Sequence, residues 1–260
     1  MIMKNRMGLA AALLAALASP AAAQADDGWD MTQIENGLIA SVDYASGQTF
    51  MVVCRGRQLD VIMNGVPVDA EGKTRWVGWT TSSGEARQTW ISAPGRPLIS
   101  AARPAHVARL LKQGGALSVR LLPTEQIERV HQYDLPLPTN SSGVDQVLAA
   151  CQVRLDDPRD ELIEIEPPFE RPGVLGNIYR KMARPNYPPS AMSAGAGEVL
   201  FSCIVAEAGA MKDCRIERET PSGVGFGQAT LAALPAARLQ LGPGVEPGRF
   251  IVSRMRYRLD

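Results

Sequence analysis

The sequence predicts an α+β protein in which an N-terminal β-rich domain with two short helices precedes a small domain built on an antiparallel sheet. Between Gly37 and Ala93, apolar and polar residues alternate between turn residues, as in antiparallel strands with one solvated face. Residues 185–260 show the same alternation around one helical segment, in the order strand, strand, helix, strand. The stretch between them, residues 156–184, is acidic and contains several prolines, which is typical of a stiff linker. We therefore expect two domains, residues 26–155 and 185–260.

The first domain is expected to consist of short strands and two helices. The expected strands are residues 38–44, 48–54, 58–64, 73–80, 87–92, 116–122 and 127–135. A helix is expected over residues 104–113, because Pro104 suits a first helical turn and two glycines follow the segment. A second helix, residues 142–151, is expected to open with a serine cap at Ser142.

The composition restricts the class of protein. Of the 260 residues, 45% are hydrophobic, which excludes a disordered chain, a collagen and a protein with many membrane spans. Lys and Arg number 27 and Asp and Glu also number 27, so the formal net charge is zero. A protein that binds the phosphate backbone uses a basic excess for its affinity, and nucleic acid is therefore not an expected partner.

Residues 1–25 have the pattern of a secretory signal peptide. Lys4 and Arg6 form a basic start, an Ala/Leu run follows over residues 7–19, and small residues offer cleavage sites after Ala23 or Ala25. The run holds about 13 residues, fewer than the roughly 20 that a membrane-spanning helix needs. We expect cleavage and export to the periplasm, and an uncleaved membrane anchor is the alternative.

Four cysteines in an exported protein favour disulfide bonds, and three pairings are open to them. Two cysteines fall in each of the two expected domains, so we expect the pairs Cys54–Cys151 and Cys203–Cys214. The chain contains no Cys-x-x-Cys, and His106 and His131 lie far from the cysteines in sequence. A zinc site or a redox-exchange site therefore has little support.

The second domain is expected to begin with a β-hairpin. A turn centred on Ala208-Gly209 places Cys203 opposite Cys214 and Phe201 opposite Ile216, which agrees with the second disulfide. Directly opposed residues have Cα atoms about 4.5–5.5 Å apart, a separation that a disulfide accepts.

The remaining strands are expected to carry a charged face. Arg218 is expected on the same face as Cys214 and Ile216, and a helix that begins near Phe226 follows that strand. The closing strand, residues 249–259, places three arginines on one face: Arg254, Arg256 and Arg258. Together with Glu198, this row is most simply the solvent-exposed face of the sheet, and a peptide- or anion-binding role is the alternative.

Residues 185–260 also carry a set of motifs in a fixed order. They are Tyr187-Pro188-Pro189-Ser190-Ala191, Gly195, Gly197-Glu198-Val199, the hairpin glycine Gly209 and the helix segment Gly225-Phe226-Gly227-Gln228-Ala229. In combination they resemble the C-terminal domain of the energy transducer TonB. The resemblance covers less than a third of the chain. The resemblance implies a three-stranded antiparallel sheet with helices, whose edge captures an extended segment of an outer-membrane transporter by strand addition. Residues 236–243 lack the aromatic-basic-Phe-x-Pro segment that commonly follows the helix of that family.

By this resemblance, we expect a periplasmic protein-interaction module whose partner is an outer-membrane or envelope transport protein. The closing strand is the expected binding surface, and its expected peptide-binding residues are Arg249, Val252, Arg254, Arg256 and Tyr257. We expect no catalytic residue, no cofactor and no metal, because the sequence contains none of the common nucleophile, zinc or phosphate-binding motifs.

A second hypothesis is a structural or dimerising envelope protein with a ligand site on the first domain. Trp76, Trp79 and Trp90 lie on neighbouring expected strands and could form a ligand platform, although core packing is the simpler interpretation. His106 and His131 are interpreted as solvated or interfacial side chains rather than as a catalytic base.

Overall fold

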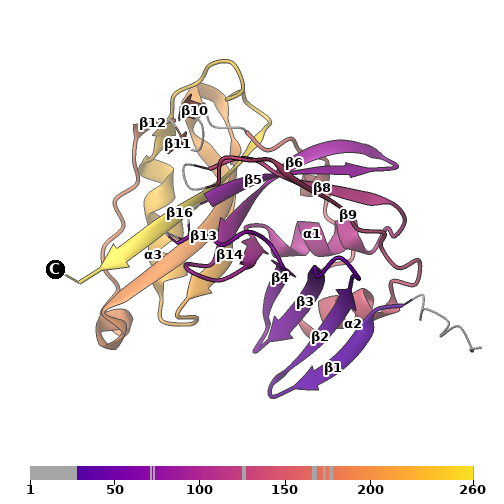
Figure 1. The fold of residues 1–260 in the computed structure, drawn as a ribbon. Helices are drawn as coiled ribbons and strands as arrows, with labels where there is room; N and C mark the ends of the chain where they lie inside the picture. The colour runs from indigo at the N-terminus through magenta and orange to yellow at the C-terminus, as the bar shows by residue number, and fades with distance from the viewer. Residues whose placement is uncertain are drawn as a thin grey trace, which may run out of the picture.

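A computed structural model (Figure 1) describes residues 28–259, apart from residues 71, 73, 125–126, 166–168, 172–173 and 176–177. The expected signal peptide, residues 1–25, lies outside the described residues. Within the described part of the chain, no helix is long and apolar enough to cross a membrane. The α+β class is confirmed, because the described elements are mainly antiparallel strands accompanied by a few short helices.

The described part of the first domain forms a nine-stranded antiparallel sheet in the order β1-β2-β3-β4-β7-β6-β5-β8-β9. Its strands are β1 (Asp30–Ile34), β2 (Gly37–Asp43), β3 (Thr49–Arg55), β4 (Gln58–Asn64), β5 (Thr74–Thr81), β6 (Gly84–Ser92), β7 (Leu98–Ala101), β8 (Leu117–Leu121) and β9 (His131–Asp134). Each expected strand overlaps an observed one. The alternation does not predict β1, which is exposed over its first four residues, or β7, which has only 4 residues.

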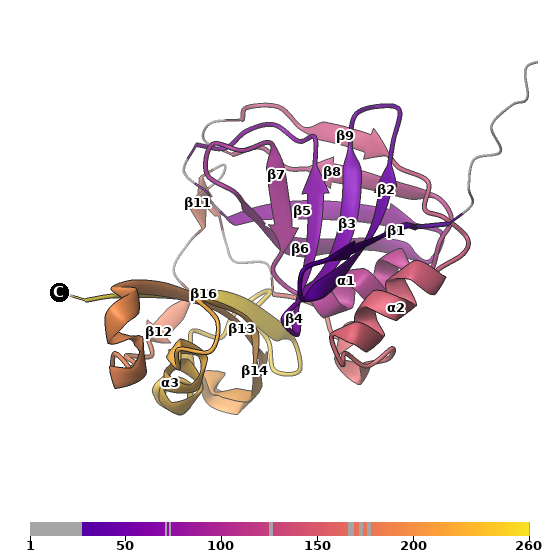
Figure 2. The ribbon, with the colours of Figure 1, turned by 90° about the horizontal axis from the view of Figure 1, so that it is seen from below.

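The sheet bends on itself, so that β2, β3 and β4 cross over β5, β6 and β8 in Figure 2. Side chains of the two layers meet in the core, where the ring centroids of Phe50 and Trp79 lie 5.8 Å apart. Trp79 in turn stacks on Trp90 with a centroid separation of 5.8 Å. Trp76 is also buried, on the other face of β5. The core-packing interpretation is therefore confirmed for Trp79 and Trp90, while Trp76 is buried outside that core.

Two helices, α1 (Pro104–Leu111) and α2 (Ser142–Ala150), lie side by side against β2, β3 and β4 (Figure 2). Their apolar residues complete the core of the first domain. Ser142 is the first helical residue and not the cap; instead, the Asn140 Oδ1 accepts a hydrogen bond from the Ser142 N–H at 3.0 Å.

Both expected disulfides are present. Cys54–Cys151 joins β3 to the residue that follows α2, with Cα atoms 5.6 Å apart. Cys203–Cys214 joins two strands of the second domain, with Cα atoms 4.1 Å apart. Each bridge therefore lies within one of the two sheet systems, as the spacing of the cysteines predicts.

The second domain contains a three-stranded antiparallel sheet in the order β14-β13-β16, with one α-helix after its first two strands. These elements are β13 (Ala196–Val205), β14 (Met211–Thr220), α3 (Phe226–Ala233) and β16 (Phe250–Arg258). Two short strand pairs accompany them, β10 (Phe169–Arg171) with β11 (Val174–Leu175) and β12 (Tyr179–Lys181) with β15 (Arg238–Leu239). Short 3-10 helices cover Pro158–Glu161, Pro189–Ala194, Glu207–Gly209 and Leu234–Ala236.

The hairpin of β13 and β14 contains two register shifts. Phe201 pairs with Ile216 as predicted, but Leu200 pairs with Arg218 because an extra residue enters β14 between these pairs. Such a bulge changes the face to which the following side chains point. The expectation that Arg218 shares a face with Ile216 is therefore wrong, and its Nη1 instead lies 3.2 Å from a carboxylate oxygen of Asp60 in the first domain.

One face of the three-stranded sheet packs against α3 around an aromatic cluster. The Phe226 ring lies 5.3 Å from that of Tyr187 and 4.5 Å from that of Tyr257, between ring centroids. Gly197 permits this packing, since a Cβ atom there would lie 2.1 Å from the Phe226 ring. The motif residues of this domain thus have a structural role in its core.

The opposite face of the sheet packs on the outer face of the first domain, and α3 lies on the far side (Figure 2). The apolar part of this contact is a small cluster of Ile91, Ala102, Leu200 and Val252. The expectation of a solvent-exposed face is therefore wrong for much of the sheet. Arg254, for example, has a side chain that is only 19% exposed.

The stretch between the domains is not a fully solvated linker. Its 3-10 helix, Pro158–Glu161, lies between α1 and the three-stranded sheet, and Arg159 is buried. Asp157 and Asp160 are ion-paired, with side chains that are 16% and 22% exposed. The acidic residues of the linker therefore include partners for buried arginines, which explains why solvation is the wrong expectation for them.

Candidate functional site

The strand β16 is an edge strand of the three-stranded sheet, and its outer edge is the candidate binding site. At its first residue, the Phe250 N–H donates to the carbonyl of Ile163 at 3.1 Å, and the Phe250 carbonyl accepts from the Ile165 N–H at 2.8 Å. The resulting bridge between Glu164 and Phe250 is parallel. The backbone of the linker therefore already pairs with this edge at one position, Glu164 with Phe250.

Backbone groups of alternate residues in a strand point to the same side. Because Phe250 bonds to the linker on the side away from β13, the N–H and C=O of Val252, Arg254 and Arg256 face that same outer side. None of the described strands pairs with β16 along this stretch. The outer edge of β16 thus presents a row of backbone donors and acceptors beyond Phe250.

Three of the expected peptide-binding residues differ in exposure along this strand. Arg254 contacts Glu198 at 3.5 Å and donates to the Gly72 carbonyl at 3.4 Å, so its guanidinium is held between the two domains. Burial lowers the pKa of Arg254. Arg256 is 58% exposed and lies 3.4 Å from the same Glu198 carboxylate. Val252 packs in the apolar contact with the first domain. The accessible positive charge of the strand is therefore near its end.

The other two expected residues take structural positions. The Tyr257 side chain is 5% exposed, and its hydroxyl lies 2.7 Å from the Thr230 hydroxyl and donates to the Phe226 carbonyl at 3.0 Å. Arg249 lies before β16 and forms an ion pair with Glu246 at 2.5 Å. Tyr257 and Arg249 are thus not part of the outer edge of β16, because the Tyr257 side chain is buried and Arg249 precedes the strand.

A second group of charged side chains lies where the two domains meet, and the sequence patterns described above do not predict it. Three side chains spaced by three residues approach Asp160 of the linker. They are Arg103, the N-cap residue of α1, and His106 and Arg109 within that helix. Arg109 Nε lies 2.5 Å from Asp160 Oδ2, and His106 Nδ1 lies 2.9 Å from Asp160 Oδ1. The spacing on an expected helix, read together with the acidic linker, is the sequence signal that could have identified this contact.

Burial and ion pairing act in opposite directions on these groups. Burial favours the neutral form of Asp160, but hydrogen bonds from Arg109 and His106 outweigh it and hold the pKa of this carboxyl far below its usual range. Burial lowers the pKa of His106, although its hydrogen bond to Asp160 opposes this shift. His106 thus lies at the contact between α1 and the linker, where Asp160 is the acceptor and its charged form is favoured.

Glu164 is the one linker carboxylate with a strongly raised pKa among the described groups. It accepts hydrogen bonds from the hydroxyl and, at 3.4 Å, from the N–H of Thr89 in β6. Burial raises the pKa of Glu164 to about 7, although Thr89 and Arg103 oppose that rise. The protonation of this residue therefore changes in the neutral pH range.

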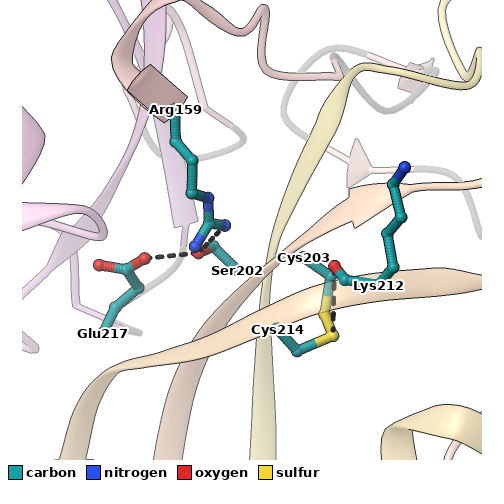
Figure 3. Close-up of a disulfide and its surroundings, with 6 residues drawn as sticks. All are labelled: Arg159, Ser202, Cys203, Lys212, Cys214 and Glu217. Atoms are coloured by element: carbon teal, nitrogen blue, oxygen red, sulfur yellow. Dashed lines mark hydrogen bonds between the residues drawn. A yellow bond between two sulfur atoms is a disulfide. The ribbon is translucent and has the colours of Figure 1, made fainter. Parts of the chain in front are cut away.

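The buried Arg159 connects the linker to the three-stranded sheet (Figure 3). Its Nη2 donates to the Ser202 hydroxyl at 2.8 Å, and Ser202 in turn donates to the Glu217 carboxylate. Figure 3 shows the Cys203–Cys214 disulfide beside this network, one residue along β13 from Ser202. The disulfide thus fixes the hairpin that presents both polar partners to Arg159.

The described residues contain no group of three His, Cys, Asp or Glu side chains that could hold a metal ion. Comparison of the chain with protein-family models finds no match, and comparison with curated proteins also finds none. The resemblance of residues 185–260 to the TonB C-terminal domain therefore rests on the motif residues alone.

Proposed function

We propose that this protein is an interaction module of the cell envelope that binds an extended polypeptide by strand addition along the outer edge of β16. The observation that carries the proposal is the parallel bridge at Phe250, where the linker backbone already pairs with this edge. Backbone pairing supplies affinity without a particular side chain, and an open edge strand is the surface that this kind of recognition uses. The TonB-like motifs of this domain support the same mode of binding.

The charge of the edge favours an acidic segment. Arg256 and Arg258 are exposed at the end of β16, whereas the Arg254 side chain is only 19% exposed. A row of like charges also opposes the pairing of two identical edges. The proposed ligand is therefore a short extended segment with acidic residues near its end, in an outer-membrane or envelope protein of the transport machinery.

The proposed location is the periplasm. The signal-peptide pattern of residues 1–25 supports export, and the two disulfides fit an oxidising compartment. The absence of a recognisable catalytic motif supports a binding role rather than an enzymatic one.

The proposal can be tested by photo-cross-linking in intact cells. A photoreactive residue in place of Arg258 is expected to capture an envelope protein, while the same residue in place of the exposed Lys212 of β14 is the control site. In this background Arg256→Pro removes one outward N–H and is expected to abolish the cross-link, whereas Arg256→Ala keeps the N–H and only weakens it.

Two outcomes would contradict strand addition at this edge. One is an unchanged cross-link in an Arg256→Pro variant whose circular dichroism shows a folded protein. The other is a cross-linked species of twice the chain mass, which would favour the alternative of a dimerising structural protein.

A further inference from the structure

A cavity of about 430 Å³ lies where the two domains and the linker meet. Its walls come from β5 and β6, from α1, from the linker residues 160–164 and from the start of β16. Cavities between about 300 and 1,000 Å³ at domain junctions are the usual sites of small-molecule ligands. This cavity is complete only when the two domains are docked.

Part of the cavity wall is apolar and includes the indole ring of Trp76. Trp76, Leu110, Leu162 and Phe250 supply the apolar surface. Trp76 is only 4% exposed, and its indole N–H has no hydrogen-bond partner among the described residues. A buried indole N–H normally has a partner, because leaving a buried donor unpaired costs about 1–3 kcal/mol. The indole N–H groups of Trp29, Trp79 and Trp90 are also unpaired within the described part of the chain, but these residues lie in the core of the first domain, so Trp76 is the tryptophan whose unpaired donor belongs to a residue of the cavity wall.

The wall also contains a buried cation. Arg103 is 7% exposed and its guanidinium carbon lies 3.9 Å over the Phe250 ring. Its contacts to described protein acceptors are long, at 3.4 Å to the Arg159 carbonyl and 3.6 Å to Asp160. Asp160 makes its short contacts with Arg109 and His106 instead. The carboxylates of Glu217, Glu164 and Asp160 attract the Arg103 guanidinium, but its contacts to Arg159 and Asp160 are too long for a bidentate pair, and its planar fork matches a carboxylate.

We propose that this cavity binds a small amphipathic monocarboxylate, with its carboxylate at Arg103 and its apolar part between Trp76, Leu162 and Phe250. Four carboxylates line the same cavity, those of Glu85, Asp160, Glu161 and Glu164, and their charges disfavour a doubly charged anion such as a phosphate monoester. The cavity includes Phe250 at the start of β16 but not Val252, Arg254 or Arg256 of the outer edge, so this proposal does not depend on peptide capture there.

The binding test uses the exported chain with both disulfides formed and three probes: 4-phenylbutyrate, indole-3-acetate and octanoate. Indole N–H resonances are followed by NMR during titration, with the Trp76 resonance assigned through Trp76→Phe. At least one probe is expected to shift the Trp76 resonance in a saturable way and to leave that of Trp79 unchanged. The carboxamide of that probe is expected to bind at least tenfold more weakly.

A matched pair of variants places the ligand in the cavity. Leu162→Trp fills the cavity from its wall without removing a hydrogen bond and is expected to weaken binding at least tenfold. Leu155→Trp changes the last residue of the first domain, which is 51% exposed and is not part of the wall, so it is expected to bind as the parent does. Absence of saturable binding for all three probes would overturn the proposal. Equal binding of acid and carboxamide, or unchanged binding by a folded Leu162→Trp variant, would do the same.

Discussion

The two faces of the three-stranded sheet bury side chains of opposite character. The face toward α3 is aromatic and aliphatic, centred on Phe226 and Tyr257. The face toward the first domain combines one small apolar cluster with buried ion pairs and hydrogen bonds, such as those of Arg218 and Arg159. Apolar burial stabilises by roughly 25 cal/mol per Å², whereas partly exposed ion pairs contribute little. The first face therefore holds the second domain together, and the second face mainly determines how the domains dock.

The largest effect is expected from breaking the aromatic face. Phe226→Ala removes a fully buried ring and should lower the free energy of unfolding by about 3–5 kcal/mol, through lost transfer free energy and the cavity left behind. Leu231→Ala, in the same helix at a residue that is 37% exposed, is the control and should cost much less. Urea unfolding followed by circular dichroism measures both. Equal losses in the two variants would show that this ring does not hold the domain core.

The next largest effect concerns Glu164, which lies between the faces of the two domains. Its pKa in the folded protein is about 7, above the ordinary value of 4.5, so folding favours the protonated carboxyl. This stabilisation is fully present below about pH 4.5 and is lost as the pH rises through 7. Arg103 supports the charged form and Glu217 opposes it.

Glu164→Gln should therefore be more stable than the parent at pH 8, by at most about 3 kcal/mol, and close to it at pH 5. Thermal unfolding across this pH range tests the prediction, with the exposed neighbour Glu161→Gln as the control. A Glu164→Gln variant whose pH profile matches that of the parent would show that this carboxyl does not titrate near neutrality.

The contrast between the faces also explains what the sequence could predict. Alternation located the aromatic face correctly, because Val199, Phe201 and Cys203 are apolar at every second position. The same alternation assigned the other face to solvent, since arginine and glutamate are usual on an exposed strand. Their burial depends on a second surface of complementary charge, and a local pattern carries no information about that surface.

Two particular residues show the limits of local patterns in this chain. Arg218 changes face because a bulge precedes it, and hairpin spacing alone does not predict a bulge. His106 meets Asp160 across 54 positions of sequence, so their contact exists only in the folded protein. The candidate edge of β16, in contrast, followed from element order, because a hairpin followed by a third strand leaves an edge on that strand.

A smaller effect is expected from the ion pairs of the docking face. Arg218 and Asp60 have side chains that are 16% and 26% exposed, and their atoms lie 3.2 Å apart. A double-mutant cycle with Arg218→Gln and Asp60→Asn should give a coupling energy of about 1 kcal/mol in domain docking. The more exposed pair of Arg215 and Asp157 is the control and should give less than about 0.5 kcal/mol. The reverse order of the two coupling energies would contradict the assignment of Arg218 to the interface.

The smallest effect on stability is expected at the end of β16, where the charged face of the three-stranded sheet extends beyond its contact with the first domain. Arg254 is 19% exposed and Arg256 is 58% exposed, and both contact the same carboxylate of Glu198. Arg254→Ala should cost about 1 kcal/mol, because it removes a half-buried contact to the Gly72 carbonyl, whereas Arg256→Ala should change stability by less than about 0.5 kcal/mol. For binding of an acidic peptide the order should reverse, since of these two arginines Arg256 offers the more accessible charge beside the open edge. Thermal unfolding and peptide titration of the two variants separate these roles. A stability loss that is larger for Arg256→Ala would show that the contact with the first domain lies elsewhere along β16.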